Sequence, residues 1–257
     1  MNRAKAKSRL KLKITRRVWW WCDSSEGVIM KNQYFGDNRD LFKYDLILRV
    51  IKETGLINHF MLIPMLTEND DTGHGEDRDR KRASAGTKNK LLVKFLNKFE
   101  EKSKRDIEHL KSFFGKQDVE MTIYHGKNEY FSRLQSEEYF EQLKDKLLSK
   151  SLVFVDPDKG MQVGKSGKEH ILYSEIETLY KRMGTKSILM IFQGFPRDEK
   201  HEEYLARKSK ELKDKISGEL PIYICDKKTI FFFLTRSKYL SNRLAKIISR
   251  YKRDYLI

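Results

Sequence analysis

Residues 152–160 read LVFVDPDKG, a short apolar run that ends in a charged turn. The run has no polar position, which predicts a strand buried on both faces of a sheet. Pro157 fixes the backbone where the run stops, and Gly160 permits a tight turn. Functional sites of α/β sheets lie beyond the carboxyl ends of the strands, so we expect Asp156 and Asp158 to face a cleft.

Four more apolar runs share this character, and they alternate with segments that repeat apolar residues at helical spacing. The expected strands are 59–66, 119–124, 152–155, 187–192 and 229–234. The expected helices are 40–53, 90–114 (one helix or two), 136–148, 170–183, 198–216 and 237–251. Strands that alternate with helices predict a three-layer α/β/α fold with a mainly parallel sheet of about five strands.

The chain has 257 residues, four prolines and no long Gly/Ser tract, which indicates a single α/β domain over residues 30–257. Residues 1–29 differ in character, because alternating Lys and Arg precede the tryptophans at 19–21. They are either a basic arm that binds nucleic acid or a stretch upstream of a natural start at Met30. No apolar run reaches the ~20 residues of a membrane helix. Two cysteines at no metal-binding spacing favour a reducing, cytoplasmic setting.

Net charge is the strongest global signal in the chain. The formal value is +16, of which residues 1–29 contribute +6, and the sequence pI is about 9.6. A domain this basic attracts a polyanion through counterion release and electrostatic steering. We therefore expect nucleic acid as the partner, with duplex DNA as the first hypothesis, and we expect no membrane and no obligate protein partner.

The last predicted helix is the clearest candidate for contact with DNA. Residues 236–253 hold seven Lys or Arg and no acid, beside an apolar stripe. One face can pack while the other presents positive charge, so we expect Arg236, Lys238 and Arg243 to contact phosphates. A helix that lies on a membrane surface is the alternative.

The segment before the first strand, residues 31–45, is dense in side chains that rarely serve packing alone. Its candidate base contacts are Asn32, Tyr34 and Phe35, its candidate acids are Asp37 and Asp40, and its candidate phosphate contacts are Arg39 and Lys43. The alternative is a helix entry, with Asp37 as the cap and Phe35 as a hydrophobic staple.

Two later loops carry further candidates. The lysines that follow the third strand and suit phosphate are Lys159, Lys165 and Lys168. After the fourth strand, the candidates are Gln193 for a base edge, Phe195 for stacking and Arg197 for phosphate. The alternative for this second loop is a plain helix start, led by Pro196 and capped by Asp198.

Three motifs together, NQYFGDNRDLFKYDL (32–46), VFVDPDKGM (153–161) and IFQGFPR (191–197), resemble a prokaryotic family over about residues 30–235. The layout is similar to that of uracil-DNA-glycosylase-like enzymes, which carry an acid near a strand end, an aromatic that stacks on the flipped base and a Pro-containing loop. That resemblance implies these roles for Phe35, Asp37, Phe195 and Pro196.

A weaker similarity is to Rossmann-like adenine methyltransferases, whose acidic–Pro–Pro–aromatic motif ends the fourth strand and grips the target amine. The residues DPDK at 156–159 resemble that motif, with Asp158 in place of the second proline and Lys159 in place of the aromatic.

The leading hypothesis from the sequence is a DNA glycosylase that flips a modified base, in defence against phage, and hydrolyses its glycosidic bond. Asp37, Asp156 and Asp158 are its candidate catalytic residues, because carboxylates stabilise an oxocarbenium-like transition state. It needs no metal and no cofactor. The alternatives are a base methyltransferase that uses S-adenosylmethionine, a metal-dependent nuclease with Glu169 or Glu175 as further ligands, and a non-catalytic DNA-binding protein.

Overall fold

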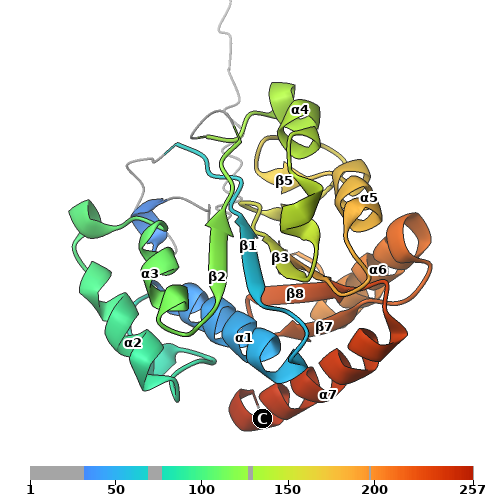
Figure 1. Ribbon diagram of the computed structural model, residues 1–257. Helices are drawn as coiled ribbons and strands as arrows, with labels where there is room; N and C mark the ends of the chain where they lie inside the picture. The colour runs from blue at the N-terminus through green and yellow to red at the C-terminus, as the bar shows by residue number, and fades with distance from the viewer. Residues whose placement is uncertain (1–31, 69–76, 127–129, 197, 257) are drawn as a thin grey trace, which may run out of the picture.

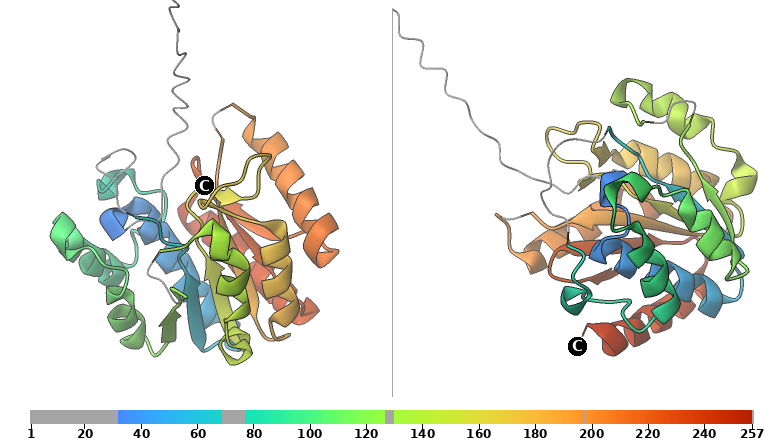
Figure 2. Two further views of the ribbon diagram at one scale, coloured as in Figure 1. Left: turned by 90° about the horizontal axis from the view of Figure 1, so that it is seen from above. Right: turned by 90° about the vertical axis from the view of Figure 1, so that its left-hand side faces the viewer.

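The computed structural model describes residues 32–68, 77–126, 130–196 and 198–256. These ranges fold into three layers, a central sheet with helices on both of its faces (Figure 1; Figure 2 shows the layers from above). One face packs against α1 (Asn38–Thr54), α2 (Lys90–Leu96), α3 (His109–Gly115) and α7 (Lys238–Tyr255). The other packs against α4 (Ser136–Glu141), α5 (Tyr173–Arg182) and α6 (His201–Leu212). The predicted α/β/α class is confirmed.

The central sheet has six strands within the described ranges. Their order is β2 (Glu120–Ile123), β1 (His59–Ile63), β3 (Ser151–Val155), β6 (Ile188–Gly194), β8 (Thr229–Leu234) and β7 (Ile222–Cys225). The first four are mutually parallel, and β8 runs antiparallel to both of its neighbours. The sheet is mainly parallel, as predicted.

The sequence analysis missed β7 and therefore counted five strands. This strand has four residues at the edge of the sheet, and only Ile224 among them is buried, so it lacks the long apolar run of a central strand. Residues 226–228 alone join β7 to β8. A parallel connection needs a crossover of a dozen or more residues, so this short link forces β8 to run antiparallel.

A second, two-stranded sheet of β4 (Gly160–Met161) and β5 (His170–Ile171) lies on the chain after the DPD turn. The helix predicted over 170–183 is therefore wrong at its start. It begins only at Tyr173, because the Glu175 carboxylate accepts a hydrogen bond from the Leu172 amide (2.7 Å) and ends the extended segment.

The segment 90–114 forms two helices, α2 and α3, which is one of the two predicted arrangements. Two other helices end earlier than predicted. Helix α4 stops at Glu141, before a short 3-10 helix at Asp145–Leu148. Helix α6 continues as a π-helix over Lys213–Ser217. No helix in the described part of the chain is both long and apolar enough to cross a membrane.

Two apolar clusters fill the space between the sheet and its helices, one on each face. Successive residues of β3 contribute to opposite clusters: Leu152 and Phe154 to one, Val153 and Val155 to the other. All five β3 residues are buried, which confirms the prediction made from their apolar continuity. The strand therefore places its carboxyl end at the centre of the sheet edge.

Candidate functional site

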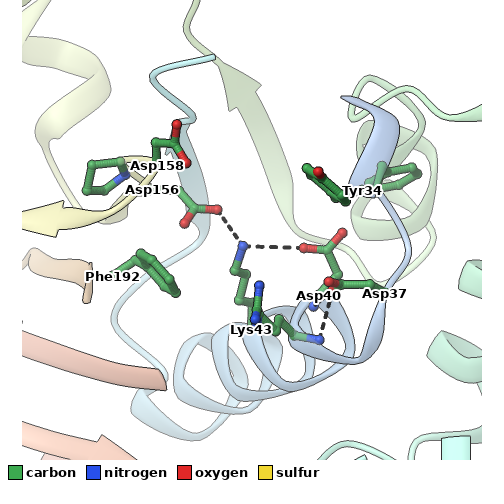
Figure 3. A pocket seen from close by; sticks show the side chains of 10 residues that line it. Tyr34, Asp37, Asp40, Lys43, Asp156, Asp158 and Phe192 are labelled. Carbon is green, nitrogen blue, oxygen red and sulfur yellow. Dashed lines mark hydrogen bonds and ion pairs between the residues drawn. The ribbon is translucent and has the colours of Figure 1, made fainter. Parts of the chain in front are cut away.

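The carboxyl ends of β1 and β3 meet at one edge of the sheet. The amide of Asp156, the first residue after β3, donates to the carbonyl of Ile63, the last residue of β1 (2.9 Å). The start of α1 lies at the same edge, and a pocket forms between them (Figure 3). Its lining residues are Tyr34, Phe35, Asp37, Arg39, Asp40, Lys43, Asp156, Pro157, Asp158 and Phe192.

Helix α1 is started by Asp37, as the helix-entry alternative predicted. Its Oδ1 accepts hydrogen bonds from the amides of Arg39 (2.8 Å) and Asp40 (3.0 Å), which satisfies two donors at the helix terminus. Asp40 in turn accepts from the Gly36 amide (2.7 Å), so the turn before the helix is closed by two carboxylates.

A buried lysine joins α1 to the turn after β3. Lys43 Nζ lies 2.8 Å from Asp156 Oδ2 and 3.4 Å from Asp40 Oδ1, and it stands 5.3 Å from the ring centroid of Phe192. Burial by itself lowers the pKa of Lys43, but the attraction of Asp156 and Asp40 outweighs it and raises that pKa. The ammonium therefore stays charged between two carboxylates.

The carboxyl groups around Lys43 bind their protons more tightly than ordinary aspartates. Burial, the largest cause, raises the pKa of Asp37 to about 6. The negative charge of Asp40 also raises this pKa, whereas the positive charges of Arg39 and Lys43 lower it. Burial also raises the pKa values of Asp40 and Asp156, although Lys43 opposes the change in both. Asp37 consequently gains or loses its proton close to neutral pH, which suits a general acid or base.

The balance of charge in the pocket decides what it can accept. Four of its lining residues are acids and two, Arg39 and Lys43, are bases. With the four acids ionised, the net charge of the lining is negative and would repel a phosphate. The same charge would attract a cation and would not repel a neutral polar ring. Lys43, the expected phosphate contact, has a side chain that is 7% exposed and is held by Asp40 and Asp156, so in this structure it does not face the surface.

Of the three base contacts predicted in the segment before α1, two line the pocket and one does not. Tyr34 and Phe35 are buried at its wall, where the Phe35 ring packs against Phe99 with centroids 5.0 Å apart. The side-chain oxygen of Asn32 instead accepts from the amide of Ile107 (3.2 Å). Asn32 thus contributes to the fold of the segment before α1.

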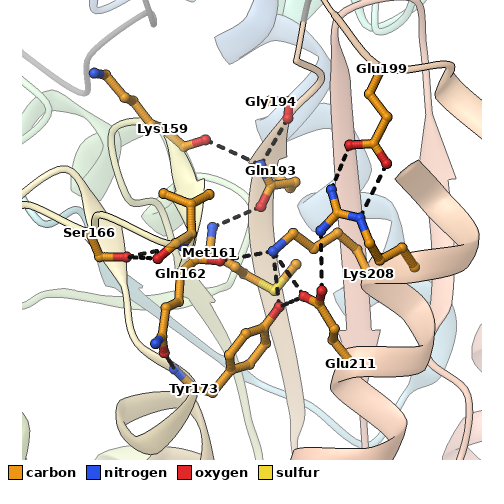
Figure 4. Close-up of polar contacts among 12 residues, drawn as sticks. Lys159, Met161, Gln162, Ser166, Tyr173, Gln193, Gly194, Glu199, Lys208 and Glu211 are labelled. Carbon is orange, nitrogen blue, oxygen red and sulfur yellow. Dashed lines mark hydrogen bonds and ion pairs between the residues drawn. The ribbon is translucent and has the colours of Figure 1, made fainter. Parts of the chain in front are cut away.

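The candidates Gln193, near the end of β6, and Phe195, directly after it, are also used within the fold. Figure 4 shows the contacts of Gln193. The Gln193 amide oxygen accepts from the Met161 amide (2.8 Å), and its nitrogen donates to the carbonyls of Gly194 (2.8 Å) and Lys159 (3.3 Å). Phe195 stacks on His201 with centroids 3.8 Å apart. Gln193 therefore holds the turn after β3 in place, and neither side chain lines the pocket.

The predicted phosphate contacts are spread over the molecule. Lys159 lies 3.6 Å from Glu169, while Lys165 and Lys168 are exposed on the loop between β4 and β5. Arg39 lines the pocket, and Arg197 lies outside the described residues.

The basic residues around α7 lie away from the pocket. Arg243 donates to the carbonyl of Glu53, near the end of α1, whereas the pocket is at the start of that helix. Seventeen residues of α-helix span about 25 Å. Arg236 donates to the carbonyls of Lys181 and Met183, at the end of α5, and Lys238 is the first residue of α7. These residues are not brought together with Asp37 and Asp156.

Asp40, a possible acid in the sequence, lies in the site with Asp37 and Lys43. The three residues recur every three positions and so share one face of the helix. Sequence reasoning missed Phe192 as part of the site, since an apolar strand residue gives no indication of which face meets a pocket.

No cluster of three or more His, Cys, Asp or Glu side chains with metal-binding geometry occurs among the residues that the structure describes. The further ligands of the nuclease hypothesis are engaged elsewhere, Glu169 with Lys159 and Glu175 with Arg133. No model of a known protein family matches the chain, and neither a curated protein nor a solved structure matches it.

Proposed function

We propose that this protein is a methyltransferase that uses S-adenosylmethionine to modify a base in nucleic acid. One observation carries the proposal. The turn Asp156–Pro157–Asp158 directly follows β3, the strand beside β1, and both of its carboxylates line a pocket with an aromatic residue, Tyr34. The acidic–Pro–Pro–aromatic motif of Rossmann-like adenine methyltransferases has its place at a strand end of this kind.

The donor set of the pocket fits the cofactor. S-adenosylmethionine carries a sulfonium and an ammonium group, and the excess of carboxylates over Arg39 and Lys43 favours cations. Asp40, the carboxylate of the pocket that takes no part in binding or deprotonating the base, is the residue that would hold such a charge. Gly73 and Gly75, the glycines that follow β1, lie outside the described residues. When bound, the cofactor would supply an electrophilic methyl group.

The remaining chemistry belongs to side chains of this chain. Asp156 and Asp158 can accept hydrogen bonds from the exocyclic amine of a base and so orient its nitrogen. The ammonium of Lys43, 2.8 Å from Asp156, opposes the rise in pKa that burial causes in Asp156 and so favours its ionised form. Asp37, whose pKa is raised to about 6, can accept the proton that the amine loses on methylation. Tyr34 offers a ring against which the base can stack.

A DNA glycosylase is the second candidate. The raised pKa of Asp37 favours it, since a carboxylate that is ionised near neutral pH can activate water. It is supported less well because Asn32, Gln193 and Phe195, three of the side chains expected to hold the flipped base, are used in packing and in hydrogen bonds within the fold.

One assay distinguishes the two candidates. The purified protein is incubated with S-adenosylmethionine labelled in its methyl group and with unmethylated single-stranded DNA, duplex DNA or RNA. Label in the nucleic acid that is absent with Asp158→Asn supports the methyltransferase. A parallel sample without cofactor is heated in alkali, and strand breaks that appear only there would mark abasic sites and support the glycosylase. Absence of label with every nucleic acid would reject the proposed function.

A further inference from the structure

A second, wider pocket lies at the same edge of the sheet as the candidate site. Its lining residues are Thr67, Glu68, Tyr130, Phe131, Ser132, Arg133, Leu134 and Lys168. The Phe131 amide donates to the Leu66 carbonyl (2.7 Å), which places the segment after β2 against the segment after β1. The pocket is therefore assembled from segments that leave the tips of β1, β2 and β4.

The wall of this second pocket is fixed by one arginine. Arg133 donates to the Gly167 carbonyl (3.2 Å) and the His170 carbonyl, and it pairs with the carboxylate of Glu175. Its guanidinium also lies 5.1 Å from the ring centroid of Phe131. Arg133 thus ties the segment 130–134 to the loop 162–169, while its own charge is neutralised by Glu175.

The rim of the second pocket exposes apolar side chains. Leu134 is 98% exposed and Tyr130 is 38% exposed, and Val163 on the adjoining loop is 43% exposed. Apolar side chains that are exposed together at the rim of a pocket can form an interaction site. Within the described residues, the Thr67 hydroxyl is buried at the pocket without a hydrogen-bond partner.

Positive charge accompanies this apolar rim. Lys165 and Lys168 are exposed on the loop 162–169, and neither makes an ion pair with a described residue. Glu68 is the acid that lines the pocket, so the two lysines outweigh it. Lysines interleaved with an aromatic and apolar side chains suit single-stranded nucleic acid, in which bases stack and phosphates need cations.

The second pocket adjoins the candidate site. The Lys159 amide donates to the Glu169 carbonyl (2.8 Å), so the loop that carries Lys168 returns to the turn that carries Asp158. A strand that crosses this loop would pass from one pocket to the other.

We infer that single-stranded or locally unpaired nucleic acid binds across this second pocket, with a base on Tyr130 and Leu134 and the backbone on Lys165 and Lys168. The inference rests on the proposed function and deepens it by naming the form of the substrate. It also assigns binding to the strand-tip edge, with two of the lysines that the sequence named, and not to the basic face of α7, which the sequence named as well.

Fluorescence anisotropy with a short labelled single-stranded DNA, its RNA equivalent and the matched DNA duplex tests the inference. The variant Lys165→Ala/Lys168→Ala is compared with Lys246→Ala/Arg253→Ala, which removes the same charge from exposed positions on α7. We expect the first variant to bind single strands about tenfold more weakly at low salt and with a smaller salt dependence, by about 0.7 per lost contact. The α7 variant should change binding less than twofold. Leu134→Asp should weaken single-strand binding as well.

Equal losses in the two variants, a preference of the wild type for duplex, or no binding of any nucleic acid would each overturn the inference. Failure of this inference can be distinguished from failure of the proposed function by combining the binding result with the methyl-transfer assay. Binding through Lys165 and Lys168 without methyl transfer would reject the proposed function alone. Methyl transfer with unaltered binding in the Lys165→Ala/Lys168→Ala variant would reject this surface alone.

Discussion

Lys43 Nζ and Asp156 Oδ2 form a 2.8 Å ion pair between residues that are 113 positions apart in the chain. The lysine comes from the first turns of α1 and the aspartate from the end of β3, and both side chains are buried. A buried pair contributes little net stability when it is intact, but loss of one partner leaves an uncompensated charge in the interior. The geometry of the candidate site therefore depends on keeping both groups.

Replacement of the buried lysine should show this dependence. Lys43→Met removes the charge between Asp40 and Asp156, so we expect the free energy of unfolding to fall by about 3–5 kcal/mol. Urea denaturation followed by circular dichroism measures it. Lys246→Met, at an exposed position of α7, should change stability by less than about 0.5 kcal/mol. A loss below about 1 kcal/mol for Lys43→Met would show that the pair does not organise the site.

The stability of the protein should depend on the charge of Asp37. Its pKa is raised from 3.8 to about 6, so the folded state holds this proton more tightly than the unfolded chain. The tighter binding of this proton therefore contributes fully to the free energy of unfolding at pH below 3.8. The contribution is lost as the pH rises through the folded-state pKa of about 6. Asp37→Asn keeps the helix cap but cannot ionise, so it should gain stability over the wild type as pH rises.

The gain can be measured by urea denaturation of both proteins at pH 4 and pH 7.5. Two pKa units correspond to at most about 3 kcal/mol, and the coupling to Asp40 makes a smaller value the expectation. The free energy of unfolding of Asp37→Asn, relative to that of the wild type, should be higher at pH 7.5 than at pH 4. The same difference at both would mean that Asp37 has an ordinary pKa.

The acidic turn should be needed for activity and little needed for folding. Asp158→Asn preserves the shape of the side chain but removes its charge, so we expect methyl transfer to fall by about 100-fold or more. Steady-state kinetics with labelled cofactor should place the loss in kcat and not in KM. Glu202→Gln, on the exposed side of α6, is the matched control and should retain full activity. An unaffected Asp158→Asn would remove the turn from the catalytic machinery.

A pair of glycines tests how the turn is held. Gly160 has φ +122°, and a Cβ there would lie 2.5 Å from the Gln193 side chain, which bonds Met161 and Lys159. Gly160→Ala should therefore destabilise the protein by about 1–3 kcal/mol through backbone strain and displaced hydrogen bonds. Gly164→Ala, with nothing within 4 Å of the added atom, should be neutral in the same thermal-melting assay. Equal melting temperatures for the two variants would contradict the role of Gln193.

The sequence predicted those features that depend on local pattern. Apolar runs identified β1, β3, β6 and β8 because central strands bury both faces. The run at β2 identified that strand as well, but β2 lies at the edge of the sheet and only Ile123 among its residues is buried. Strand ends followed by acids identified Asp156 and Asp158, and the cap role of Asp37 was recognised as an alternative. Each of these signals lies within about ten residues of sequence.

Features that depend on contacts between distant segments could not be predicted. Lys43 looked like a phosphate contact because its partner Asp156 is remote in sequence. Gln193 and Phe195 lie on either side of the end of β6, as site residues often do, but their side chains contact Met161 and His201. Charge alone gave α7 its assigned role, and only the fold separates that helix from the pocket.

The inserted position of β8 has a consequence for how the chain is made. During synthesis the segments that form β1, β2, β3 and β6 emerge first, and the edge of β6 stays unpaired until residues 229–234 have left the ribosome. An apolar strand whose edge is unpaired can pair with another chain or with the wrong segment until its partner strand is available. A nascent chain arrested before residue 229 should consequently carry the acidic turn already but expose β6, and such chains should be the ones that chaperones bind.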